Sequence, residues 1–273
     1  MSERGWKPTR TVFITLAAIP FLYPFLFLIG TALKPAAEFE TNEAGLPGAF
    51  TFDNVKDAWS HADLGGAMLN SVVSVSIAVV LTVTISTLAA FWFVRHESRL
   101  TAALRWALII TMAIPLPVFI LPLFLRLSDW GMTDNLVVMG FVYAGWISSF
   151  GLYLIYAYLK GLPPEVFEAA QIDGATVRQQ LWHVIVPLSR PVLVTLAVFT
   201  FIWSWSDLFA SVILVQDSEK RLLIPATSSL ADEHATNIPR NAAGVVIAMI
   251  PMFMVFLAGQ RALVRGILAG VGK

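Results

Sequence analysis

Long apolar stretches alternate with short polar segments along the whole chain. Six of these stretches are almost free of Asp, Glu, Lys and Arg, and each holds at least 20 residues. A helix needs about 20 apolar residues to cross a hydrocarbon layer of roughly 30 Å. The spans predicted from this pattern cover residues 11–33, 70–94, 106–125, 136–159, 191–215 and 241–260. The pattern therefore predicts an all-α polytopic membrane protein with six transmembrane helices in one membrane domain, residues 11–262.

The composition agrees with a membrane protein. Charged residues make up 13% of the 273 residues, whereas about 25% is usual in soluble domains. So few charges cannot cover a globular surface, which argues against a soluble enzyme. Lys and Arg balance Asp and Glu at 18 each, so no net positive field attracts a nucleic acid. The chain has no cysteine, which excludes disulfides, Cys-ligated metal sites and thiol nucleophiles.

The distribution of Lys and Arg predicts the orientation in the membrane, because cytoplasmic loops are enriched in these residues. If the N-terminus is cytoplasmic, the cytoplasmic segments hold twelve Lys and Arg and the outer segments hold six. Residues 1–10 are then a cytoplasmic N-terminus and residues 263–273 a cytoplasmic C-terminal tail. Two outer segments, 33–69 and 217–240, are long enough to dock a partner, or they serve only as polar connectors.

One carboxylate, Asp207, falls inside a predicted span. Ionisable residues within a membrane are costly and usually face a bundle interior or a watery cavity. Thr200, Trp203, Asp207 and Ser211 follow one another at helical spacing, which would place them on one face, with Ser204 beside it. This face is interpreted as a wall of a translocation path. The alternative is an interfacial Asp near the outer headgroups, with the Trp residues forming part of an aromatic belt.

The segment 161–187, between the fourth and fifth predicted spans, is too long for a simple connector. Pro164 suits the start of a helix, and Glu168 lies near that start, where the helix dipole favours a negative charge. Gly174 can end this helix, and Thr176 can cap a second one that runs toward Pro187. The residues therefore predict a short helix–turn–helix on the cytoplasmic face.

The same loop carries a family motif. Glu168-Ala-Ala-x-x-Asp173-Gly174-Ala, followed by Ile185-x-Pro187-Leu, resembles the E-A-A loop of the permeases of binding-protein-dependent ABC importers. In that family the loop forms the coupling helix between transmembrane helices 4 and 5 and docks into a cleft on a cytoplasmic ATPase. The resemblance therefore implies an ATPase-coupling site formed by Glu168, Ala169, Ala170, Asp173 and Gly174.

Further motifs resemble the carbohydrate-importing branch of these permeases, among them Leu33-Lys-Pro35 and Phe52-Asp-Asn54. The C-terminus, residues 260–273, is similar to that of the second permease of maltose-type systems. The resemblance implies a place in the prokaryotic cell membrane and a heterodimer with a homologous first permease. It also implies two ATPase subunits and an extracytoplasmic sugar-binding protein as partners. Ser204 follows Trp203 where the family often has Asn, so detailed substrate contacts do not carry over.

The tail Gly270-Val-Gly-Lys273 lacks the glycine spacing of a phosphate-binding loop. ATP and Mg²⁺ are therefore expected on a separate ATPase chain, with no cofactor, metal or catalytic residue on this one. The four histidines lie far apart and outside the predicted spans, which argues against an intramembrane enzyme. A stand-alone secondary transporter or channel is an alternative, although such proteins usually carry several ionisable residues within the membrane. Maltodextrin, trehalose, other oligosaccharides, polyols and glycerophosphodiesters all stay open as substrates.

Overall fold

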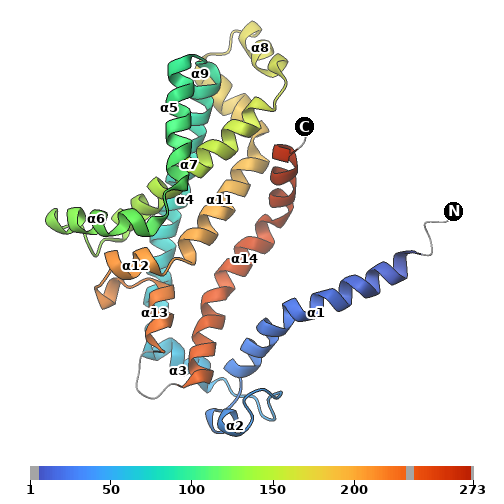
Figure 1. The fold of residues 1–273 in the computed structure, drawn as a ribbon, viewed down its shortest axis with the longest axis vertical. Coiled ribbons are helices and arrows are strands. Elements are labelled where there is room, and N and C mark those ends of the chain that lie inside the picture. Colours follow the sequence, from blue (N-terminus) through green and yellow to red (C-terminus); the bar gives the residue numbers. More distant parts are fainter. Residues whose placement is uncertain (1–5, 232–236, 272–273) are drawn as a thin grey trace. The chain divides into compact units, whose positions relative to one another are not determined.

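Every regular element is a helix among residues 6–231 and 237–271, the part of the chain that the computed structural model describes (Figure 1). The ends of the predicted N-terminal segment and tail, residues 1–5 and 272–273, lie outside the described residues. The chain divides into two compact units, Met1–Gly65 with Ala226–Ile250 and Gly66–Pro225 with Pro251–Lys273. In the described part of the chain, four helices are long and apolar enough to cross a membrane: α1 (Trp6–Ala32), α4 (Leu64–Arg95), α7 (Leu136–Lys160) and α14 (Ile238–Val271).

Two further candidate spans are bent. The first consists of α5 (Arg99–Ile110), the 3-10 turn η1 (Thr111–Ala113) and α6 (Leu116–Asp129), with a bend of 96°. The second consists of the helical segment Val177–Leu188 and α11 (Arg190–Trp205), with a bend of 75°. If each bent pair counts as one span, the candidate spans number six. The expectation of one continuous helix in residues 106–125 and in residues 191–215 is corrected by these interruptions.

Proline explains the first bend. Ile114 precedes Pro115, and a proline ring disfavours helical backbone angles at the residue before it. Ile114 accordingly has φ −82° and ψ 112°, and Pro115 has φ −69° and ψ 143°. Helix α6 then begins at Leu116, and Pro117 lies in its first turn, where a missing N–H leaves no helical bond unmade.

The predicted span 191–215 is interrupted after α11, where Asp207 precedes the short helix α12 (Phe209–Leu214). Asp207 Oδ1 accepts a hydrogen bond from the N–H of Ala210 at 3.3 Å, and Oδ2 accepts one from the N–H of Ser211 at 3.0 Å. The hydroxyl of Tyr143 on α7 donates to Oδ2 at 2.9 Å. The carboxylate therefore satisfies first-turn N–H groups that have no partner within the helix, and it ties the interruption to α7.

Helix α7 is central to the unit Gly66–Pro225 with Pro251–Lys273. One buried cluster surrounds Tyr143 where α7 meets α6 and α12, and a second lies near the opposite end of α7. At Gly151 the backbone of α7 comes so close to α4 that an added Cβ would lie 2.3 Å from Ser86 Oγ. Small residues at such contacts let membrane helices approach closely, so this glycine makes the packing of α7 on α4 possible.

A buried lysine organises the segment between α1 and α4. Lys34 is 1% exposed, and its Nζ donates to two main-chain carbonyl groups at 2.6 and 2.8 Å. Buried Asn54 donates to two more carbonyls at 2.9 and 2.8 Å. The N–H of Gly48 donates to the Glu38 carboxylate and lowers the pKa of Glu38. These bonds give the segment a defined structure. Its helices are α2 (Ala36–Thr41) and α3 (Asp53–His61).

Two further short elements lie between α12 and α14. They are η3 (Ser218–Lys220) and α13 (Leu223–Ser229).

We expect Asp207→Leu to destabilise the protein, because the N–H groups of Ala210 and Ser211 and the hydroxyl of Tyr143 lose their acceptor. A buried group left without its partner costs about 1–3 kcal/mol, so the midpoint of thermal unfolding in detergent should fall by several degrees. Asp207→Asn keeps one acceptor oxygen, which can still bind the N–H of Ser211 and the hydroxyl of Tyr143, but it loses the acceptor for Ala210. Its midpoint should therefore fall by less than that of Asp207→Leu. An unchanged midpoint for Asp207→Leu would show that the cap contributes nothing.

Candidate functional site

The loop between α7 and α11 begins with α8 (Pro164–Ile172), which starts and ends where its sequence predicts. Gly174 has φ +71°, a left-handed conformation that glycine adopts without strain. The N–H of Gly174 donates to the carbonyl of Gln171, and the N–H of Ala175 donates to that of Ala170, both at 3.0 Å. These two bonds form a Schellman motif, so the end of α8 is well defined.

A second helical segment follows at once. The N–H of Gln179 donates to the Thr176 hydroxyl at 3.4 Å, and Gln179 Oε1 accepts from the N–H of Thr176 at 2.8 Å. This capping box confirms the predicted cap at Thr176. The segment consists of α9 (Val177–Gln179), the π-helical turn η2 (Gln180–Ile185) and α10 (Val186–Leu188). The sequence predicts only a helix that runs toward Pro187 and does not predict the π turn within it. The turn lies just before Pro187, which lacks the N–H that an α-helix would bond four residues back.

The predicted coupling residues differ in exposure. Three lie on α8, and Asp173 and Gly174 directly follow it. Ala170 is 8% exposed and packs inward. The other four, Glu168, Ala169, Asp173 and Gly174, are exposed. Ile172, which the motif did not single out, is 85% exposed. Because residues three and four positions apart share a helical face, Ala169 and Ile172 form one outward surface. Glu168 lies at the edge of that surface and also borders the inward side of α8.

The inward side of α8 is incompletely packed. A hollow of about 350 Å³ lies between α8 and the ends of α4 and α7, with Arg95, Lys160 and Glu168 in its wall. Lys160 forms an ion pair with Glu97 and lowers the pKa of Glu97. Gln180, 4% exposed, lies between the loop and α4. The hydropathy pattern did not reveal Gln180, because it follows the polar residues Arg178 and Gln179 and looks like part of a solvated turn.

The predicted path residues do not share one continuous helical face. Thr200, Trp203 and Ser204 belong to α11, Asp207 lies in the interruption and Ser211 belongs to α12. Thr200, Ser204 and Ser211 are at most 1% exposed and are enclosed by the chain itself. Trp203 is 37% exposed, and Asp207 is half-buried and holds the interruption together. Trp203 is therefore the member of this set that offers the most accessible surface.

Trp203 is part of an aromatic cluster within this unit. Its ring centroid lies 4.9 Å from that of Phe150 on α7 and 5.6 Å from that of Phe199 on α11. Trp146 lies one helical turn before Phe150 on α7. Trp146 also lines an open groove beside α7.

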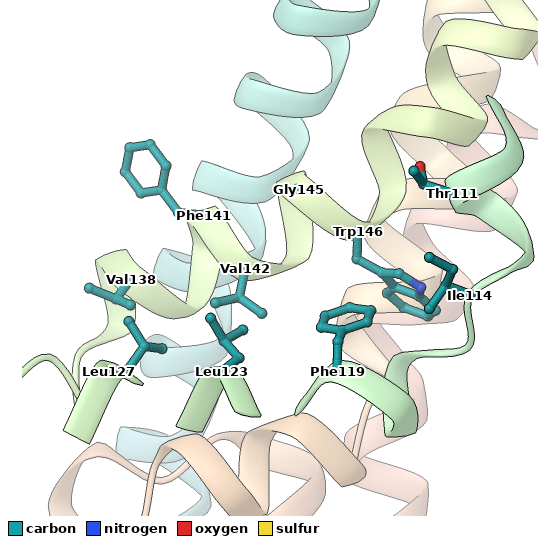
Figure 2. A pocket seen from close by; sticks show the side chains of 10 residues that line it. All are labelled: Thr111, Ile114, Phe119, Leu123, Leu127, Val138, Phe141, Val142, Gly145 and Trp146. Atoms are coloured by element: carbon teal, nitrogen blue, oxygen red, sulfur yellow. The ribbon is translucent and has the colours of Figure 1, made fainter. Parts of the chain in front are cut away.

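That groove is open, apolar and about 540 Å³ in volume. Figure 2 shows Phe119 and Leu123 of α6 opposite Val142 and Trp146 of α7. At its edge the Thr111 hydroxyl is 2.6 Å from the Ser149 hydroxyl, close enough for a hydrogen bond. The groove exists because the bend at Ile114–Pro115 turns α6 away from the line of α5, a change of direction that hydropathy alone does not predict.

Comparison with known proteins identifies the family. A family model described as a binding-protein-dependent transport system inner membrane component matches residues 82–269. The chain is 27% identical over 264 residues to the melibiose/raffinose/stachyose import permease protein MelC of Bacillus subtilis (strain 168). The matched region covers 96% of this chain and 95% of MelC. It is 28% identical over 255 residues to the probable starch degradation products transport system permease protein AmyC of Thermoanaerobacterium thermosulfurigenes, over 93% of this chain and 92% of AmyC.

The fold is shared with a solved structure of a bacterial ABC transporter involved in the import of the acidic polysaccharide alginate. The TM-score is 0.79 at 21% sequence identity, over 96% of this chain and 98% of that chain.

Among residues 6–231 and 237–271, no group of three or more His, Asp and Glu side chains could hold a metal ion. The family match covers more than half of the chain and includes the loop that contains α8. The chain therefore belongs to the family of inner-membrane components of binding-protein-dependent transport systems.

Proposed function

We propose that this chain is the permease subunit of an ATP-driven ABC importer and forms half of the translocation path for a carbohydrate. Relatives named for the import of melibiose, raffinose and stachyose and for the transport of starch degradation products support this substrate class. The aromatic cluster around Trp203 supports it as well, because aromatic rings offer flat apolar faces that match the C–H faces of sugars. An extracytoplasmic binding protein delivers the carbohydrate, and a homologous first permease completes the path as a heterodimer.

The observation that carries this function is the outward surface of α8. Ala169 allows another protein to approach the helix closely, and Ile172 offers an apolar side chain that is 85% exposed. A small residue beside an exposed apolar one suits close contact with a partner protein. The Schellman motif at Gly174 and the capping box at Thr176 keep this surface in place. Two copies of a separate ATPase chain hydrolyse ATP, and one of them docks on this surface.

The membrane topology belongs to the same proposal. Six spans with both termini in the cytoplasm place α8 on the cytoplasmic side, next to the ATPase. The segment between α1 and α4 then faces outward, where Leu46 at 89% exposure and Phe50 at 72% exposure are accessible to the binding protein. Buried Lys34 and Asn54 hold this segment in a defined structure, which suits a docking platform.

The coupling role predicts that Gly174→Val and Ala169→Trp weaken the attachment of the ATPase without preventing membrane insertion. A side chain at Gly174 meets no atom within 4 Å, so its effect is conformational, at roughly 1 kcal/mol for a left-handed residue. That energy corresponds to about fivefold weaker docking. The measurement is copurification of the ATPase with a tagged permease, together with hydrolysis stimulated by the loaded binding protein.

Gly131→Val is the matched control. Gly131 has φ +65° and meets nothing within 4 Å either, but it lies between α6 and α7, away from the loop. The control should carry the same strain and keep wild-type copurification. Wild-type copurification and transport in both Gly174→Val and Ala169→Trp would exclude this loop as the coupling element. Ala170→Trp is not a useful test, because Ala170 is buried within the chain.

The topology predicts which single cysteines an impermeant maleimide labels in intact cells, and the chain has no cysteine of its own. Ser60 and Arg178 are both exposed. Ser60→Cys should be labelled from outside, and Arg178→Cys should be labelled only after the membrane is made permeable. Labelling of Arg178→Cys in sealed cells would reverse the orientation.

The path role predicts that Trp203→Ala impairs uptake and leaves assembly intact. Loss of an aromatic contact worth roughly 1 kcal/mol lowers transport by about fivefold. Trp106→Ala is the control, because Trp106 is exposed on α5 and belongs to neither the cluster nor the groove. Uptake of the radiolabelled sugar into cells measures the effect. Near-wild-type uptake by both Trp203→Ala and Asp207→Asn would favour the aromatic-belt interpretation over the path.

A further inference from the structure

Gln180 lies buried between the coupling loop and the end of α4. It is 4% exposed. Its Nε2 donates to the main-chain carbonyl of Ala175 at 2.8 Å, and its Oε1 accepts a hydrogen bond from Arg95 Nη1. A buried amide is costly unless both of its ends find partners. Here each end binds a different part of the structure, so the side chain forms a bridge.

On the loop side, the bridge holds the end of α8. The N–H of Ala175 donates to the carbonyl of Ala170 in the last turn of α8, as part of the Schellman motif. The carbonyl of the same residue accepts the bond from Gln180. Ala175 is therefore bonded to α8 through its N–H and to Gln180 through its carbonyl, and a displacement of α8 reaches Gln180 through one residue.

On the membrane side, the bridge holds α4. Arg95 is the last residue of this 32-residue helix. Its guanidinium carbon lies 5.5 Å from the centroid of the Phe91 ring, one turn earlier on α4, so the side chain is held against its own helix. A hydrogen bond between a charged donor and a neutral acceptor is stronger than one between neutral groups. The hydrogen bond from Arg95 to Gln180 is therefore stronger than one between two neutral side chains.

Packing connects α8 to α4 only in part, through Phe167, which packs against the buried cluster that contains Phe91 and Phe93 of α4. The hollow of about 350 Å³ lies between them, and Arg95, Phe167 and Gln171 are among the residues of its wall. Across the hollow itself no side chain of α8 contacts α4, so the hydrogen bonds of Gln180 add a second connection beside the packing of Phe167. Gln180 also begins the π-helical turn η2, and such turns often occur at functional sites.

We propose that Gln180 is a positioning residue that links the coupling helix α8 to α4, through the Ala175 carbonyl on one side and the Arg95 guanidinium on the other. Movement of α8 with the ATPase is then passed to a membrane-spanning helix by hydrogen bonds. The inference rests on the proposed coupling role of α8. It adds a residue outside the E-A-A motif, and it assigns the receiving helix.

The test is Gln180→Met in the assembled transporter in proteoliposomes. Methionine has a similar volume, is apolar and makes neither hydrogen bond. The ATPase should still copurify, because the outward surface of α8 is unchanged. Sugar transported per ATP hydrolysed should fall by at least about fivefold, the lower range of measured coupling between sites. Gln216→Met is the matched control, because Gln216 is exposed after α12, away from the loop, and it should keep the wild-type ratio.

Arg95→Met and the double variant test the bridge as a unit. Residues that act in series are non-additive, so the double variant should lose no more coupling than either single variant. A wild-type ratio of transport to hydrolysis in Gln180→Met, or additive losses in the double variant, would overturn the proposal. If Gln180→Met does not assemble, Gln180→Glu keeps the bond to Arg95 and loses the donor to Ala175. It should then show the uncoupling, and failure of both variants to assemble would indicate a purely structural role.

These outcomes are separate from failure of the proposed function. That function fails if the ATPase does not copurify with the wild-type chain, or if Gly174→Val and Ala169→Trp have no effect. The proposed bridge fails when the ATPase copurifies and those two variants act, while Gln180→Met transports at the wild-type ratio.

Discussion

Backbone N–H and C=O groups find no water inside a bilayer, so every interruption of a helix there needs internal partners for the groups it frees. This constraint accounts for the chemistry at both interruptions of the apolar stretches. After Ile114, prolines occupy the positions where a helical N–H would have had no partner. After Trp205, the carboxylate of Asp207 accepts bonds from two N–H groups of the next helix and from the hydroxyl of Tyr143. A carboxylate that the sequence suggested as part of a translocation-path wall thus has a structural use, and the candidate path rests on the aromatic side chain of Trp203.

Helix α7 joins the two regions to which we assign function. Its Tyr143 binds the interruption beside the aromatic cluster, and its last residue, Lys160, pairs with Glu97 next to the coupling loop. At about 1.5 Å per residue, the 25 residues of α7 extend roughly 37 Å. Close packing at Gly151 fastens this helix to α4 between those two points. A displacement near Lys160 therefore has a packed route along α7 toward Tyr143.

The coupling loop combines a rigid outer surface with an incomplete inner contact. Its caps at Gly174 and Thr176 define the helix ends by local hydrogen bonds. Behind α8, a polar bridge through Gln180 supplements the packing of Phe167 as a connection to α4. Hydrogen bonds have direction and a narrow range of length, so a polar bridge is suited to pass on a small displacement.

The sequence by itself determined the features that depend on neighbouring residues. Four long spans followed from hydropathy, and the bounds of α8 followed from Pro164, Gly174 and Thr176, because caps and left-handed turns are set within a few residues. The family motif was likewise readable in one short segment. The tertiary structure decided what depends on distant partners: Ala170 is buried while Ala169 is exposed, and Gln180 is buried because Arg95, 85 positions away, meets it. A hydropathy pattern records how apolar each residue is, but it holds neither the direction of a bend nor the identity of a remote hydrogen-bond partner, since both arise only when the helices pack.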